Sequence, residues 1–177
     1  LSDFTSSIAG EISVQLTQDE EQRIASGKTR KVNPAAVEET MRGRYYWNQR
    51  TPEGLTKAIE FFNGALAEDP AYAPAYVGLA DSFALRGYYN IDSNDSYLKA
   101  RASAKQALEL DPSSADAHTA SGMVALLQDW DARAAERAFR RAIELDPSSA
   151  SAHYWLWILL SVTGRLELAD REIREAI

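Results

Sequence analysis

The two histidines of the chain, His118 and His153, are the residues with the clearest potential for chemistry. They occupy the same slot of a repeated sequence pattern, so we expect them at neighbouring positions in a stack of repeats. A metal site would need further ligands at suitable geometry around them. We therefore favour packing at a helix interface for both histidines, and we predict no metal and no cofactor for this chain.

The other polar side chains predict no catalytic centre. Glu38 and Glu39 fall on a predicted solvated helix face, whereas a catalytic carboxylate pair needs a shared pocket that shifts both acidities. The sequence contains no cysteine, no glycine-rich phosphate loop and no nucleophile elbow. Alternating arginine and glutamate over 136–144 is typical of charge pairing on a helix surface. We predict that the chain is not an enzyme.

Composition narrows the possible partners. The net charge of −7 and the pI near 4.9 argue against general nucleic-acid binding, which requires a basic face to displace counterions. No apolar run reaches the roughly 20 residues that a membrane helix needs, and no signal peptide is present. The chain begins at Leu1 and stops at Ile177 within a helical pattern, so we interpret it as a piece of a longer protein.

A seven-residue phrase occurs twice and defines the elements that carry these side chains. Glu-Leu-Asp-Pro-Ser-Ser-Ala stands at 109–115 and again at 144–150, and the two prolines are 147 − 112 = 35 residues apart. A period near 34 residues with a proline at the end of each unit is typical of a helical repeat. Proline cannot continue a helix, so each Asp-Pro predicts a helix end.

The repeat predicts four helix pairs, each closed by a turn. The expected helices are 34–49 and 53–68, 72–87 and 95–110, 114–128 and 131–145, and 149–163 and 165–177, in units 34–70, 71–112, 113–147 and 148–177. The longest insertion between the two helices of a pair falls on 87–95, where we expect a loop.

The first part of the sequence predicts a separate arm. Phe4, Ile8, Ile12 and Leu16 form one apolar stripe over a predicted helix at 3–16, and a capping signal at Thr17 predicts a second short helix. We assign 1–32 to this two-helix arm and its linker, and 33–177 to the repeat array.

The repeat units resemble the tetratricopeptide repeat (TPR). The third unit carries His118, Ser121, Gly122 and Ala125 in its first helix, followed by Ala135, Phe139, Ala142 and Pro147, and the other units agree with it to different degrees. This resemblance implies an all-α, right-handed α-α superhelix of about four helix pairs. It also implies that the first helix of each pair lines a concave groove.

The resemblance also implies which residues line that groove. They are Thr40, Arg44, Trp47 and Asn48 in the first unit, Val77, Asp81, Ala84 and Leu85 in the second, Thr119, Met123, Leu126 and Leu127 in the third, and Tyr154, Ile158, Ser161 and Val162 in the fourth. Either a partner helix or peptide occupies this mainly apolar groove, or the arm does. The lysine and asparagine pattern with which some relatives clamp a terminal carboxylate is absent at these positions.

Two further surfaces are candidates for contact. Tyr88 and Tyr89, in the insertion, either form a contact patch or fold over the end of the second pair. Trp155, Trp157 and Ile173 are candidates for an exposed apolar face at the end of the array, through which two copies of the chain could form a homodimer.

A narrower resemblance rests on Asp129-Trp130-Asp131 followed by 135–142, on 42–48 and on the linker Val32-Asn33-Pro34. These segments are similar to the repeat regions of bacterial multidomain signalling proteins. In those proteins the repeats follow a TolB-like segment and an adenylate or guanylate cyclase, a winged-helix regulator or a Ser/Thr kinase.

The narrower resemblance implies a protein–protein interaction scaffold or sensory module of a larger bacterial regulatory protein. Its ligand would be a partner helix, a peptide or a sister subunit. The alternative is an intramolecular regulatory domain of a cyclase or kinase, with no catalytic activity in this part. The compartment stays open, and we favour the cytoplasm over an extracytoplasmic location.

Overall fold

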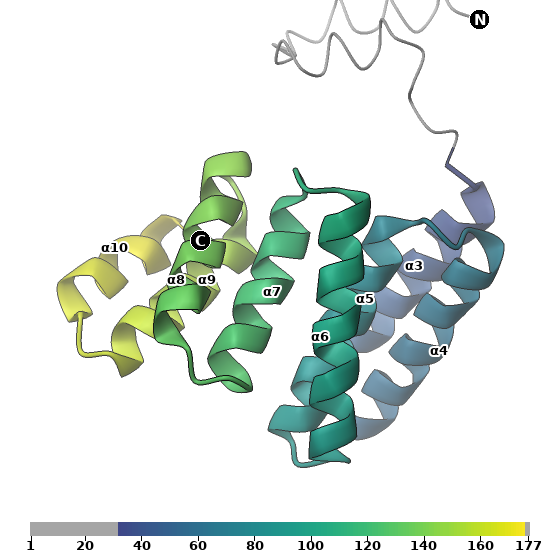
Figure 1. The fold of residues 1–177 in the computed structure, drawn as a ribbon, viewed down its shortest axis with the longest axis horizontal. Helices are drawn as coiled ribbons and strands as arrows, with labels where there is room; N and C mark the ends of the chain where they lie inside the picture. The colour runs from purple at the N-terminus through teal and green to yellow at the C-terminus, as the bar shows by residue number, and fades with distance from the viewer. Residues whose placement is uncertain (1–31, 176–177) are drawn as a thin grey trace, which may run out of the picture. The chain divides into compact units, whose positions relative to one another are not determined.

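A computed structural model describes residues 32–175, and these residues form eight α-helices in four consecutive pairs with no strand (Figure 1). The helices are α3 (Pro34–Trp47), α4 (Pro52–Glu68), α5 (Ala73–Tyr88), α6 (Ser93–Leu110), α7 (Ala115–Leu127), α8 (Ala132–Leu145), α9 (Ala150–Val162) and α10 (Leu166–Glu175). The predicted all-α fold is confirmed, with each described helix end within two residues of its expected position. The predicted arm helices lie outside the described residues.

The repeated phrase folds into the same turn both times. In the first copy, Asp111 Oδ1 accepts hydrogen bonds from the backbone N–H of Ser113 at 3.0 Å and from its hydroxyl at 2.7 Å. Ser114 then caps the next helix by accepting from the N–H of Ala117 at 3.1 Å. The second copy repeats all three bonds. The phrase therefore ends one helix at its aspartate and begins the next after its second serine.

At one equivalent position of the second, third and fourth units, a side chain hydrogen-bonds to the turn that precedes its helix. Tyr76 Oη donates to the carbonyl of Pro70 at 3.2 Å, and Nε2 of His118 and His153 lies 3.0 Å and 3.1 Å from the carbonyls of Pro112 and Pro147. His153 is buried, and its Nδ1 lies 2.7 Å from Oε2 of Glu172. Both histidines thus stabilise the joints between units.

The expected loop at 87–95 is shorter than predicted. Helix α5 continues through Tyr88 and α6 begins at Ser93, so the inserted residues mostly lengthen the two helices. The short connection is possible because Asn90 and Asp92 adopt left-handed backbone conformations, with φ of 59° and 47°. Such residues reverse the chain within a tight turn.

The helices form an inner and an outer row. Among the described residues, each first helix contacts the next first helix (α3 with α5, α5 with α7, α7 with α9), whereas the second helices α4, α6, α8 and α10 do not contact one another. Because the first helices are in contact and the second helices are spaced apart, the stack curves with the first helices on its inner side. The first helices therefore form the concave side, as in an α-α superhelix.

Large side chains fill the spaces between neighbouring helices, both within a pair and between pairs, where a small residue permits close approach. Phe62 and Phe139 are fully buried. A Cβ atom added at Gly122 would lie 2.4 Å from Cε1 of Phe139, and one added at Gly78 would lie 2.3 Å from Cε1 of Phe62. These glycines are therefore required by the packing.

None of the helices in the described part has the length and apolar character needed to cross a membrane.

Candidate functional site

The concave side carries two adjoining hollows. The first, of about 440 Å³, lies across α5, α7 and α9 and is lined by Arg50, Leu85, Tyr88, Tyr89, Leu127, Tyr154, Trp155 and Ile158. The second, also about 440 Å³, is lined by Trp47, Arg50, Ala150, Ser151, Tyr154, Trp155 and Ile173. Three residues, Arg50, Tyr154 and Trp155, belong to both. We call the two hollows together the inner groove.

The inner groove is bounded by residues from both ends of the array. Arg50 follows α3 in the first pair, whereas Tyr154 and Trp155 lie on α9 in the fourth pair. Side chains roughly a hundred residues apart in sequence thus line the same space. This arrangement requires the curvature of the whole inner row.

Aromatic rings dominate the lining. The ring centroid of Tyr154 lies 5.8 Å from that of Trp155 and 5.6 Å from that of Trp157. The rings of Tyr88 and Tyr89 are 5.7 Å apart, and both tyrosines are exposed, as is Tyr154. Exposed tyrosines around an apolar hollow supply large contact areas with a polar tip, which is the composition of many binding surfaces.

Arg50 is a site residue that sequence reasoning missed. Its Cζ stacks 3.6 Å above the centroid of the Trp47 ring, and its backbone is left-handed, with φ of 55°. Arg50 is exposed, but nearby protein atoms remove part of its hydration and so lower its pKa, while Tyr89 and Asp81 oppose this effect. The sequence feature that could have predicted this position is the turn between Gly43 and Ala58. It is three residues longer than the regular interval, which gives the chain room to turn back toward the groove.

Arg44 has a different role from the one expected. Its Nη1 donates to Oδ2 of Asp81 at 2.6 Å, across α3 and α5. Asp81 is only 7% exposed, and this burial raises its pKa, while the Arg44 guanidinium lowers it. Arg44 is therefore engaged in holding two inner helices together, and its charge is already neutralised.

Only part of the predicted groove set lines the inner groove. Trp47, Leu85, Leu127, Tyr154 and Ile158 do so, and Tyr88 and Tyr89, predicted as a separate contact patch, line it as well. Of the other predicted groove residues, Arg44 is half-buried, Asn48 is exposed but lines neither hollow, and several are buried inside the array, among them Thr40, Val77, Asp81, Thr119 and Met123. The buried residues deviate from expectation because consecutive first helices contact one another. Their side chains fill those joints instead of facing the groove.

The expected exposed end face also differs. Trp155 is buried because it faces the core formed with α7, and Trp157 and Ile173 are partly buried. The exposed apolar side chains near this end are Val162, Leu166 and Leu168.

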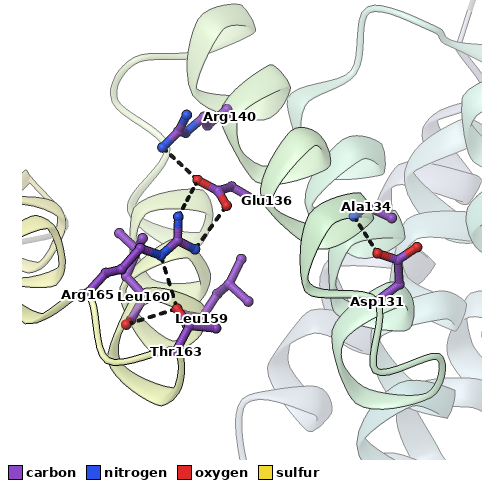
Figure 2. A network of polar contacts seen from close by, with 8 residues as sticks. All are labelled: Asp131, Ala134, Glu136, Arg140, Leu159, Leu160, Thr163 and Arg165. Carbon is purple, nitrogen blue, oxygen red and sulfur yellow. Dashed lines mark hydrogen bonds and ion pairs between the residues drawn. The ribbon is translucent and has the colours of Figure 1, made fainter.

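A charged network joins α8 to the turn between α9 and α10 (Figure 2). The guanidinium of Arg165 makes two contacts of 2.9 Å with the carboxylate of Glu136, and Arg140 Nη2 lies 2.7 Å from the same carboxylate. The hydrogen bond from Arg165 lowers the pKa of Glu136. Arg165 also donates to the hydroxyl of Thr163. The network stabilises the joint between the third and fourth pairs and lies outside the inner groove.

The described residues hold no group of three or more side chains that could bind a metal ion. The inner groove is lined by aromatic rings and by one cation, Arg50, which is a composition suited to binding.

No protein-family model matches the sequence, and no curated protein matches it. Solved structures do match its fold. A thermophilic TPR protein from Thermus thermophilus superposes with a TM-score of 0.69 at 18% identity, over 88% of this chain and 77% of that one. The TPR domain of Arabidopsis OM64 gives 0.54 at 18% identity, over 81% and 97% of the two chains.

A third structure is the first TPR of Spaghetti (RPAP3) bound to the HSP90 peptide SRMEEVD. It gives a TM-score of 0.53 at 19% identity, over 73% of this chain and 94% of that one. At these identities the likeness concerns the fold, and the chain has the helical-repeat fold of TPR proteins.

Proposed function

We propose that this chain is a protein-interaction module and that its inner groove binds a peptide or helix of another protein. One observation carries the proposal: two adjoining aromatic hollows lie on a continuous row of packed helices. A rigid, concave and mainly apolar surface of this kind binds a segment with little loss of its own conformational freedom. We propose no catalytic activity for this module.

The peptide ligand class is supported by one of the solved relatives. The first TPR of Spaghetti (RPAP3) holds an HSP90 peptide on the same fold. The groove of this chain presents its own chemistry, with aromatic rings and Arg50, so a different peptide sequence is expected here.

A direct test is peptide-display selection on the full chain, followed by affinity measurements on two matched variants. Tyr154→Ala removes an exposed ring from both hollows, so the selected peptides should bind about tenfold or more weakly. Tyr45→Ala removes an exposed tyrosine on α3 that lines neither hollow and should leave affinity unchanged. The proposal fails if no peptide is selected or if both variants bind like the parent.

We further propose, on the resemblance of residues 42–48 and 129–131, that the module is a scaffold or sensory part of a larger bacterial regulatory protein. Reading the parent gene upstream of Leu1 tests this. A cyclase, kinase or winged-helix domain there would support it.

Self-association is a second proposed mode of binding. Val162, Leu166 and Leu168 give the α9–α10 end an exposed apolar character that a second copy could cover. Light scattering over a concentration series tests this, and a constant monomer mass would exclude it.

A further inference from the structure

The charge available in the inner groove is concentrated at one residue. Arg44 faces the buried carboxylate of Asp81 and is neutralised by it. Arg50 lines both hollows, and within residues 32–175 its side chain makes no ion pair and no hydrogen bond. Asp81 acts on Arg50 only at a distance, because its carboxylate is paired with Arg44. A cation at the wall of an apolar groove with no carboxylate in direct contact is a favourable partner for an incoming anion.

The guanidinium of Arg50 is held in place before any ligand arrives. Stacking on the Trp47 ring at 3.6 Å restricts its orientation but occupies only a face, so the N–H groups along its edge stay available. A planar fork of this kind binds a carboxylate through two parallel hydrogen bonds. Arg50 is exposed, so an incoming ligand can reach these N–H groups.

The position of Arg50 indicates where the anion lies in the ligand. Arg50 borders both hollows, with Leu85 and Ile158 in the first and Ile173 in the second. A bound chain that presents its carboxylate to Arg50 therefore has apolar surface on either side. That geometry suits the side chain of an Asp or Glu in the middle of a peptide. A peptide whose terminal carboxylate lay at Arg50 would end there and would fill only one of the two hollows.

The net charge of the chain limits how acidic the ligand is. At −7, the molecule as a whole repels a run of acidic residues, and attraction is confined to the vicinity of Arg50. A single carboxylate between apolar residues gains the local contact with little of the wider repulsion.

We infer that the inner groove selects extended peptides in which one Asp or Glu is flanked on both sides by apolar or aromatic residues. Arg50 binds the carboxylate of this acidic residue. The inference rests on the proposed function.

The experiment uses the full chain and a library of short peptides with blocked ends. The central residue is Asp, Glu, Asn, Gln or Ala, and the two positions on each side vary among Ala, Leu, Phe and Tyr. A second arm carries Asn at the centre and a free terminal carboxylate. Fluorescence polarisation measures affinity for the parent chain, for Arg50→Gln, and for Arg133→Gln, an exposed residue of the outer helix α8 with the same change of charge.

The parent should bind Asp and Glu peptides with apolar flanks about tenfold more tightly than their Asn and Gln counterparts. Arg50→Gln should abolish this preference while Arg133→Gln retains it. Equal binding of acidic and amide peptides, tight binding only of the free-terminus arm, or a preference that survives Arg50→Gln would each overturn the inference but leave the proposed binding function standing. No binding of any peptide by the parent would overturn both.

Discussion

At the scale of single residues, the most constrained group is the carboxylate of Asp81. It is nearly inaccessible to water, and its one described ionic partner is Arg44, at 2.6 Å. A buried charge of this kind is tolerated only while its counter-ion stays in place. The pair therefore couples the register of α3 to that of α5.

Replacing Arg44 by glutamine should destabilise the fold in a pH-dependent way. Burial raises the pKa of Asp81 and Arg44 opposes this, so the pKa of Asp81 rises further in Arg44→Gln. An acid whose folded pKa is raised contributes most at low pH and loses that contribution as pH rises through the folded pKa. We expect a loss of about 2 kcal/mol near pH 8 and a clearly smaller loss near pH 5, from urea unfolding.

The double variant Arg44→Gln, Asp81→Asn serves as the control. It lacks the carboxylate, so its loss of stability relative to the parent should not grow with pH in the same way. An equal loss in Arg44→Gln at both pH values would contradict a buried ionised Asp81.

At the scale of helices, packing between a glycine and a phenylalanine sets how closely the helices of a pair approach. Gly122 on α7 is covered by Phe139 of α8, whereas Gly64 on α4 faces only the flexible end of Glu39. The same substitution at these two glycines should therefore have opposite effects.

Gly122→Ala should lower the free energy of unfolding by about 1–3 kcal/mol, because the added methyl group overlaps a buried ring that has no room to move. Gly64→Ala should be neutral or stabilising by up to about 1 kcal/mol, because alanine favours the helix and Glu39 can move aside. Thermal and urea unfolding measure both. Similar losses at the two sites would contradict this explanation, because of the two glycines only Gly122 lies against a buried ring.

The helices could be predicted closely because their start and stop signals are local. Asp111 and Ser114 end one helix and begin the next through bonds that span only two or three residues. The connection after α5 was predicted less well. Whether inserted residues extend two helices or form a loop depends on the support that neighbouring helices give them, and sequence spacing does not contain that information.

At the scale of the whole molecule, stability depends on contacts between neighbouring units. The central helix α5 buries ten residues, whereas α10 buries Ala169 alone among its described residues. In a linear array, a helix with neighbours on one side opens more readily than one in the middle.

Native-state hydrogen exchange of the isolated chain should reflect this gradient. Amides of α5 and α7 should exchange only through global unfolding, and amides of α10 should exchange faster through local opening. Uniform protection along the array would indicate a single cooperative unit, and slow exchange confined to α10 would contradict the gradient.

The amino-acid sequence by itself determined the helical repeat, its period and the ends of its described helices, because caps, prolines and apolar periodicity act over a few residues. Only the tertiary structure decided which side chains line the inner groove. Arg50 and Tyr154 share a hollow because small rotations between successive helix pairs add up along the array. Those rotations arise from side-chain packing such as Phe62 against Gly78, so the groove is a property of the assembled stack.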